Sequence, residues 1–317
     1  MSASSMNPAE ATAAMEGITI RDSCLGGLGM VATRTIPRGS LLVSERPIFT
    51  IASQEAISVG WPFHVLENFE AMTKADQEKY LALKGDHHLL SQIDIFFLER
   101  AQKSDDKNAD VCAIFLTNHT GMNEDGFAVY HLFSRINHSC SPNAASVYHQ
   151  NSGQMRVYAL KDLAEGDEVL ISYGIDLLQP HEQRSALLKF DCKCPVCKLP
   201  DHQDSDSRRW RIKGVQNGCV KFITGQAPPD HLIPVADVSE GLQLAKENVK
   251  LFTTEGLIGS ELREAWEALA LLHTKAGDEA SAGKCLRLAN RQGQVCQGED
   301  NPYNRYRAEL GHILTKR

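Results

Sequence analysis

Three thiols crowd into one short stretch of the chain, at a spacing that could hold a metal ion. Cys192, Cys194 and Cys197 lie within six residues. Structural zinc takes four ligands in a tetrahedron, and cysteine and histidine are its usual ligands. The spacing therefore predicts a zinc site whose fourth ligand comes from a distant segment or from just beyond the cluster. His202 and His181 are candidates for that ligand, and three buried free thiols are the alternative without a metal.

Two further stretches could do chemistry only in combination. One is the polar segment Arg135–Asn143, which contains Asn137, His138 and Cys140. The other is Glu168–Gly174, an apolar run that ends at Tyr173. Taken alone, the first stretch fits a polar turn and the second fits a strand whose last aromatic residue packs on a core.

The two stretches and the cysteine cluster, in this order, resemble the core of the SET-domain protein lysine methyltransferases. The closest likeness is to the SMYD branch, from about Ile18 to Cys197 with a gap in the middle. The resemblance implies transfer of a methyl group from S-adenosylmethionine to a lysine side chain of a histone or non-histone protein. It also implies that the fourth zinc ligand is Cys140, which would complete a site with Cys192, Cys194 and Cys197.

The resemblance also implies a cofactor site and a catalytic position. Tyr173 takes the catalytic position, where its hydroxyl would point at the methyl group in transit. Phe190 would cover the adenine, although it is equally consistent with a core residue of a helix over 181–190. The other residues implied to bind the cofactor are Gly27, Leu28, Gly29, Asn118, Ser134, Asn137 and His138.

The chemistry of methyl transfer explains why no acidic or imidazole base is needed. The methyl donor is already a strong electrophile, but the lysine must attack as a neutral amine. Free lysine has a pKa of about 10.4, and an apolar channel with a cation beside it lowers that value. Positioning and desolvation should therefore carry most of the rate. The rival hypothesis is a catalytically weak SET-fold scaffold that binds protein partners through C-terminal helices.

Apolar periodicity predicts an α+β fold in which a β fold of short strands positions these residues. Strands are expected near residues 18–21, 30–34 and 41–43, and again at 145–148, 155–160 and 168–172. Val65, Leu66, Phe69 and Met72 recur at helical spacing, which predicts a helical insert over about 61–120. We expect a SET domain over 17–200, with a post-SET zinc loop at 190–200.

Residues 201–317 are predicted to form a helical C-terminal region. An amphipathic helix around Leu262–His273, a turn at 276–278 and a second helix over 280–289 resemble a tetratricopeptide hairpin. The basic cluster Arg208–Lys213 is interpreted as solvated helix surface rather than as a nucleic-acid contact. Between Ser44 and Val111 there is no cysteine, so the zinc-binding MYND module of SMYD proteins is not expected.

Composition places the chain among soluble globular proteins. It has 317 residues, 42% of them hydrophobic, and a formal net charge of −7, which argues against a surface that coats nucleic acid. No apolar run approaches the roughly 20 residues of a membrane helix. Residues 1–16 are expected to form a disordered tail. We further expect a monomer in the nucleus and/or cytoplasm, with a protein substrate as its partner.

Overall fold

The computed structural model describes residues 17–299 apart from 59, 92–93, 96–97, 100–104, 124–125, 189 and 227. The predicted tail over 1–16 lies outside the described residues. The chain divides into two compact units. Unit 1 contains Val43–Ile136 and Tyr148–Arg156, and unit 2 contains 17–42, Asn137–Val147 and 157–299.

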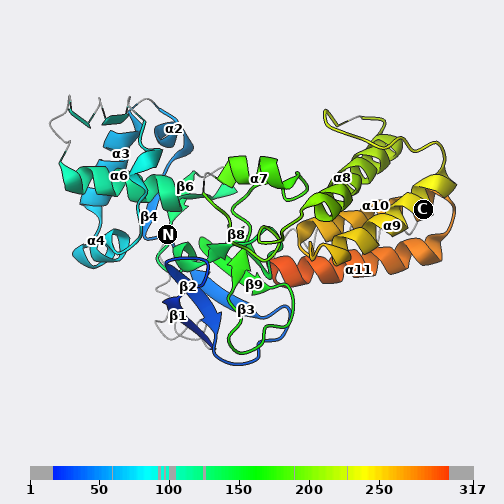
Figure 1. The fold of residues 1–317 in the computed structure, drawn as a ribbon, viewed down its shortest axis with the longest axis horizontal. Helices are drawn as coiled ribbons and strands as arrows, with labels where there is room; N and C mark the ends of the chain where they lie inside the picture. The colour runs from blue at the N-terminus through cyan, green and yellow to red at the C-terminus, as the bar shows by residue number, and fades with distance from the viewer. Residues whose placement is uncertain are drawn as a thin grey trace. The chain divides into compact units, whose positions relative to one another are not determined.

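Unit 1 combines a small antiparallel sheet with the helices of the predicted insert (Figure 1). The sheet has the order β4-β6-β5. The helix predicted around Val65 is α3. Helices α4 and α6 begin where side chains accept backbone hydrogen bonds, at Thr73 and Asp105 respectively. The elements are β4 (Phe49–Ile51), α2 (Ser53–Ala56), α3 (Trp61–Ala71), α4 (Lys74–Leu81), η1 (His87–Leu89), α6 (Asp106–Asn118), β5 (Thr120–Gly121), β6 (Phe127–Val129) and η3 (Phe133–Arg135).

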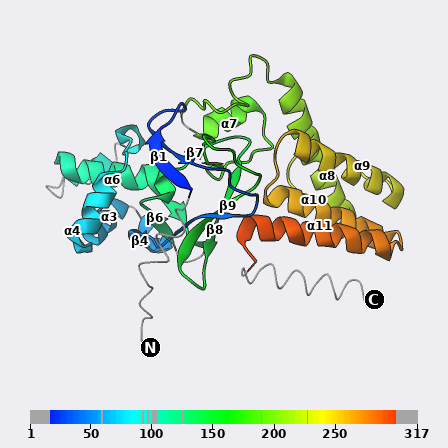
Figure 2. The same cartoon turned by 90° about the horizontal axis from the view of Figure 1, so that it is seen from below.

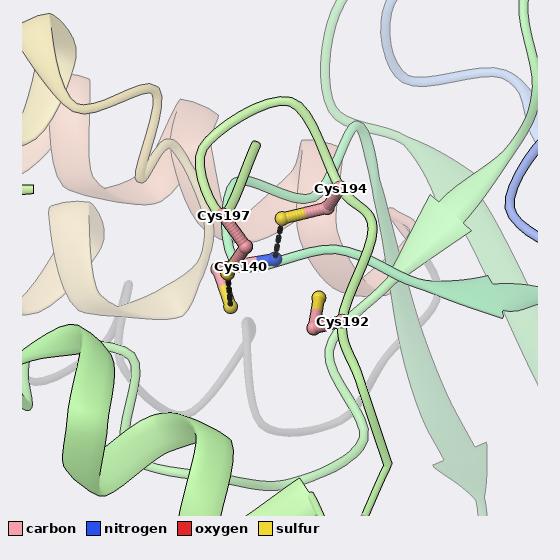
Figure 3. A group of neighbouring side chains, drawn as sticks. All are labelled: Cys140, Cys192, Cys194 and Cys197. Atoms are coloured by element: carbon pink, nitrogen blue, oxygen red, sulfur yellow. Dashed lines mark hydrogen bonds between the residues drawn. The ribbon is translucent and has the colours of Figure 1, made fainter. Parts of the chain in front are cut away.

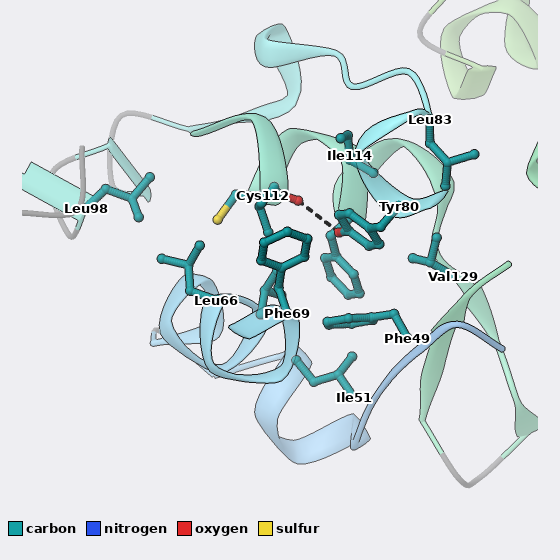
Figure 4. Close-up of a cluster of buried hydrophobic side chains, with 13 residues drawn as sticks. Phe49, Ile51, Leu66, Phe69, Tyr80, Leu83, Leu98, Cys112, Ile114 and Val129 are labelled. Atoms are coloured by element: carbon teal, nitrogen blue, oxygen red, sulfur yellow. Dashed lines mark hydrogen bonds between the residues drawn. The ribbon is translucent and has the colours of Figure 1, made fainter. Parts of the chain in front are cut away.

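The core of unit 1 is almost purely apolar (Figure 4). Its one buried hydroxyl among the cluster members belongs to Tyr80 and donates to the carbonyl of Val111 at 2.9 Å. We call this cluster the apolar core; its buried members are Phe49, Ile51, Val65, Leu66, Phe69, Tyr80, Leu83, Leu98, Val111, Cys112, Ile114, Phe115 and Val129.

The strands predicted at the two ends of the SET region are present as short pairs. β1 (Ile18–Asp22) and β2 (Leu28–Ala32) form an antiparallel hairpin, with Ile18 opposite Ala32. β7 (Asn137–His138) runs parallel to β10 (Leu170–Ile171). The third sheet has the order β3-β9-β8 and contains β3 (Leu41–Glu45), β9 (Gln154–Ala159) and β8 (Ala144–His149). These pairings bring Asn137 and His138 beside the segment that leads to Tyr173.

Helices form the rest of unit 2, and four of them pack side by side (Figures 1 and 2). The predicted hairpin is present as the pair α10 and α11, joined by a turn at Gly277 with φ +74°. The helices are α7 (His181–Leu188), α8 (Gln203–Thr224), α9 (Val238–Thr254), α10 (Ser260–Lys275) and α11 (Glu279–Gln297). No described helix combines the length and apolar content that crossing a bilayer requires.

Helix α8 differs from the prediction in length and in what it buries. The predicted helical region over 201–317 includes α8, which begins at Gln203 and runs to Thr224, well beyond the short basic helix surface expected at 208–213. The interpretation of its basic cluster as solvated surface is wrong for Arg209 and Lys213, which are 0% and 7% exposed. Because these charged residues lie on the buried face of the helix, its apolar periodicity is weak in the sequence.

Candidate active site and metal centre

The four predicted cysteine ligands converge in unit 2 (Figure 3). The sulfurs of Cys140, Cys192, Cys194 and Cys197 all lie within 4.8 Å of one another, and Cys140 Sγ is 3.6 Å from Cys197 Sγ. Zinc–sulfur bonds of about 2.3 Å in a tetrahedron place the sulfurs roughly 3.8 Å apart. The donor set and its spacing are therefore compatible with a structural zinc ion.

The alternative histidine ligands do not join this cluster. His181 and His202 instead stack on each other, with ring centroids 3.7 Å apart and an angle of 11° between the planes. Among the described residues, the ligand group consists of cysteines alone.

Two buried arginines lie beside the cysteines. Arg184 and Arg209 are both 0% exposed. Arg209 donates to the carbonyl oxygen of Cys140 at 3.1 Å. Burial lowers the pKa of Arg184. The negative sulfurs of Cys140 and Cys197 act in the opposite direction, and the net shift of the Arg184 pKa is upward. Four thiolates around one divalent ion would leave a net negative charge, which these guanidinium groups would compensate.

His138 connects the metal centre to Tyr173. Its Nδ1 accepts the backbone N–H of Tyr173 at 3.1 Å, and its Nε2 lies 3.4 Å from Cys140 Sγ. Because a neutral imidazole that accepts at one nitrogen carries its proton on the other, Nε2–H donates to the sulfur. The side chain predicted to bind a cofactor thus has both nitrogens engaged inside the protein, which leaves its backbone to meet a ligand.

Tyr173 lies two residues beyond β10 and is 49% exposed. Its ring centroid is 5.2 Å from that of His138 and 6.2 Å from that of Phe190. The surrounding protein atoms, and to a smaller degree the charge of Glu168, raise the pKa of the Tyr173 hydroxyl to about 12. The hydroxyl therefore stays protonated at neutral pH, even though much of the residue's surface faces solvent.

Phe190 is not a core residue of the preceding helix. Helix α7 ends at Leu188, and Phe190 is 46% exposed. Its ring meets those of His138 and Tyr173 edge-on, with centroid distances of 6.2 Å in both cases. An exposed aromatic face beside these two residues is available to stack on a flat ligand.

The predicted glycine turn lies against Asn137. Gly26 and Gly27 have φ of +115° and +65°, and a Cβ built at either one meets no atom within 4 Å. The backbone of this turn is therefore open to a ligand. Beside it, the side-chain amide of Asn137 donates to the carbonyl of Leu28 at 3.0 Å and to Glu168 Oε1 at 2.7 Å.

Asn118 and Ser134 belong to unit 1. Asn118 is the last residue of α6, and its amide donates to the carbonyls of Ile114 and Lys84, each at 2.8 Å. The side chain therefore caps the end of its own helix. Ser134 lies in η3, and its buried hydroxyl has no hydrogen-bond partner among the described residues.

A cavity of about 290 Å³ opens beside Tyr173 within unit 2. Ser172 and Gly174, the chain neighbours of Tyr173, both line it. The remaining wall is mostly small or aliphatic, and its one charged lining residue is Glu261. Its size is at the lower end of ligand pockets, which range from about 300 to 1,000 Å³, so it suits a side chain better than a nucleoside.

The sequence does not predict the residues that hold the site residues in place by hydrogen bonds. Glu168 begins the motif that ends at Gly174, but nothing in the sequence around Glu168 or Ser23 predicts the contact between them. Arg184 and Arg209 gave no signal, because a buried arginine in a helix looks like any surface arginine until its partners are known.

The comparisons with known proteins agree with this geometry. Residues 27–174 match the family model described as SET domain. Histone-lysine N-methyltransferase set5 of Schizosaccharomyces pombe is 28% identical over 193 residues, which cover 59% of this chain and 53% of the relative. N-lysine methyltransferase SMYD2 of Gallus gallus is 28% identical over 202 residues, covering 55% and 44%. The human SMYD2 is 23% identical over 310 residues, covering 73% and 70%.

The chain thus spans about half the length of the first two of these relatives. The match over residues 27–174 includes the glycine turn, the Asn137-His138 segment and Tyr173. Residues 27–174 therefore match a SET domain, and the chain is similar to the SMYD and Set5 lysine methyltransferases.

Proposed function

We propose that this protein transfers a methyl group from S-adenosylmethionine to a lysine side chain of a protein. The observation that carries the proposal is the position of Tyr173. Its ring lies against His138, and its chain neighbours line a cavity with a largely uncharged wall. The segment that carries Tyr173 thus adjoins both the proposed cofactor residue His138 and a cavity of side-chain size, which suits group transfer between two ligands.

The residues available to hold the cofactor are those of the glycine turn, Asn137, His138 and Phe190. The open backbone at Gly26 and Gly27 permits the close approach that this role requires. Bound there, S-adenosylmethionine would supply an electrophilic methyl group carried on a positively charged sulfur. Asn118 and Ser134 belong to unit 1, and their predicted contact with the cofactor stays a prediction.

The cavity beside Tyr173 is proposed to receive the target lysine. Its lining includes Pro142, Ala144, Leu160 and Ile175, which would strip water from the ammonium group. Desolvation disfavours the charged amine and so favours the neutral nucleophile. Since the Tyr173 hydroxyl has a pKa of about 12, it acts as a neutral hydrogen-bonding group and not as the base.

Zinc is proposed to have a structural role. The four cysteines leave no ligand position for a substrate, which is the property of a closed structural site. Through His138, the ion would fix the backbone at Tyr173. The proposed substrate is a histone or another protein, and a nuclear and/or cytoplasmic location stays a prediction. We expect no direct binding of nucleic acid and a monomeric state.

The proposal is tested with the full chain and methyl-labelled S-adenosylmethionine. Calorimetry measures cofactor affinity, elemental analysis counts zinc, and label transfer is followed on lysine residues of histones and of a cell lysate. We expect Tyr173→Phe to reduce transfer at least about 100-fold while cofactor affinity changes little, because the hydroxyl acts on the transferring group. Tyr148→Phe, a second tyrosine away from the cavity, is the matched control and should retain transfer.

Two outcomes would contradict the proposal. A zinc-loaded chain that binds no S-adenosylmethionine has no cofactor site. A chain that binds the cofactor but labels no protein lysine, or labels it equally well with Phe at position 173, is a binding scaffold and not an enzyme of this mechanism.

A further inference from the structure

The carboxylate of Glu168 joins segments that lie far apart in the sequence. The hydroxyl of Ser23 donates to it, with Oγ 2.8 Å from each carboxylate oxygen. The amide of Asn137 donates to its Oε1 at 2.7 Å. One side chain thus holds the start of the glycine turn and the first residue of β7 at the same time.

Close packing leaves little freedom at this junction. A Cβ built at Gly29 would lie 2.2 Å from Glu168 Oε1 and 3.1 Å from Asn137 Nδ2, so only glycine fits between them. The adjoining backbones are also paired, since Val169 N donates to the carbonyl of Met30 at 2.8 Å. Glycine at position 29 therefore serves the contact between Glu168 and Asn137 as well as any ligand.

Ser23 links Glu168 to the glycine turn by hydrogen bonds. Its hydroxyl accepts the backbone N–H of Leu25 at 3.0 Å while it donates to Glu168. Its own N–H donates to the carbonyl of Gly27 at 2.8 Å. Hydrogen bonds to Ser23 therefore hold the open backbone at Gly26 and Gly27, and the Glu168 carboxylate orients the Ser23 hydroxyl.

The same contact orients Asn137. One of its amide hydrogens goes to the carbonyl of Leu28 and the other to Glu168. With both hydrogens engaged, Asn137 can offer a ligand only its amide oxygen, which is an acceptor. A ligand at this position must present a donor, such as an ammonium group.

We propose that Glu168 is a positioning residue for the cofactor site, holding the turn at Ser23–Leu28 and the amide of Asn137 in one arrangement before the cofactor binds. The inference rests on the proposed function for the identity of the ligand. The arrangement itself is a property of the chain without ligand. The negative charge of Glu168 also contributes to the raised pKa of Tyr173, so its removal has a second, separate readout.

The test compares Glu168→Gln with Glu165→Gln, an exposed acid three residues earlier in the same loop. Glutamine keeps the shape of Glu168 but presents a donor where two donors already point. Hydrogen exchange of the cofactor-free chain is measured on peptides covering residues 22–30. We expect faster exchange in Glu168→Gln and wild-type exchange in Glu165→Gln, with the same zinc content in both.

Calorimetry with S-adenosylmethionine gives the second readout. Loss of hydrogen bonds to a charged group should weaken binding by about 10-fold or more in Glu168→Gln. Ser23→Ala, a milder change that carries the test if Glu168→Gln does not fold, should weaken binding in the wild type but add little in the Glu168→Gln background. The pKa of Tyr173 should fall below about 12 in Glu168→Gln but stay raised, because burial is the larger cause of its shift and is unchanged.

The outcomes separate the inference from the function on which it rests. Wild-type exchange and affinity in both Glu168→Gln and Ser23→Ala would overturn the inference while leaving the proposed function intact. A wild-type chain that binds no S-adenosylmethionine would overturn the proposed function, whereas the exchange measurement would still decide whether Glu168 holds the turn.

Discussion

The apolar core of unit 1 consists almost entirely of hydrocarbon side chains that pack on one another. A second core, in unit 2, contains the cysteines of the candidate metal centre. We call the latter the metal-centred core. Three of the four cysteine ligands, Cys140, Cys192 and Cys194, are buried members of this cluster. The other buried members are Leu177, Leu178, Leu188, Ile212, Val249, Phe252, Leu257, Leu262 and Ala265.

The two cores differ in how their buried polar groups are satisfied. In the apolar core, the Tyr80 hydroxyl donates one hydrogen bond, to the backbone carbonyl of Val111. Beside the metal-centred core, the Arg209 guanidinium donates hydrogen bonds to Glu255, to Ser205 and to the carbonyl of Cys140. Burying charge is costly unless it is paired, so the second core depends on particular partners and, with the proposed zinc bound, on an ion. The first core depends mainly on apolar area removed from water.

The largest expected difference between the cores is their response to metal loss. Cys194→Ser should release zinc, whose apparent binding free energy in small structural sites is about 10–16 kcal/mol. That exceeds or matches the net stability of most domains, roughly 5–15 kcal/mol. We expect hydrogen exchange to rise sharply in peptides around Cys140 and Cys192, and to rise far less around Val65 and Val111.

Cys112→Ala is the control for this experiment, because Cys112 is a fully buried thiol of the apolar core. It should leave zinc content unchanged and cost only the packing of one small side chain. Equal exchange in zinc-free and zinc-loaded protein around Cys192 would contradict the distinction between the two cores.

The next largest effect concerns the buried charge at Glu255. Its carboxylate accepts hydrogen bonds from Ser205 Oγ at 2.6 Å and from Arg209 Nε at 3.0 Å, and Glu255 is 7% exposed. Glu255→Gln leaves the Arg209 guanidinium without its counter-charge, which should lower the free energy of unfolding by about 3–5 kcal/mol. Urea unfolding measures the change.

An exposed ion pair between α8 and α9 provides the matched control. Arg211 meets both carboxylate oxygens of Glu247 at 2.7 and 2.8 Å, but the two side chains are 43% and 40% exposed. Glu247→Gln should cost only about 0.2–1 kcal/mol, because solvent screens the pair. Similar losses for the two substitutions would show that burial does not set the strength of these ion pairs.

Sequence patterns predicted the apolar core better than the metal-centred one. The helical spacing of Val65, Leu66 and Phe69 is a local property and correctly predicted α3. The cysteine spacing predicted a metal site, but it could not choose between Cys140 and a histidine without the resemblance to a family. The positions of Arg209 and Glu168 depend on partners far away in the chain, and no periodicity reports such contacts.

Short strands were the other elements that the sequence did not reveal. β4, β5, β6 and β7 are two or three residues long, so an alternating pattern has no room to appear. They exist because neighbouring segments pair with them. The strand predicted over 168–172 is likewise reduced to β10, since only Leu170 and Ile171 pair with β7.

A deletion inside the apolar core should destabilise unit 1 without affecting the metal. Leu66 is 0% exposed, and Leu66→Ala should cost about 3 kcal/mol, within the usual 2–5 kcal/mol for such changes. Leu81→Ala, at a position 40% exposed, should change stability by less than about 0.5 kcal/mol. Calorimetric melting with zinc counting checks both. Loss of zinc from Leu66→Ala would show that the two cores are not separate in energy.

The smallest expected effect is a pH dependence confined to unit 1. Glu45 accepts the backbone N–H groups of His131, Leu132 and Phe133 at about 3 Å. Burial raises the pKa of Glu45 from its ordinary value of 4.5, although these hydrogen bonds act in the opposite direction. The folded state therefore holds a proton on Glu45 more tightly than the unfolded chain does.

The sign of the stability change follows from this uptake. The contribution of Glu45 is fully present below pH 4.5 and is lost as the pH rises through its raised folded-state pKa. Glu45→Gln cannot titrate, so over this window the wild type should lose stability relative to the variant. Urea unfolding at a series of pH values measures the difference, and Glu78→Gln, at an exposed position in α4, should parallel the wild type. A constant difference between wild type and Glu45→Gln across the series would mean that the three backbone hydrogen bonds balance burial at this carboxylate, and a difference of the opposite trend would mean that they outweigh it.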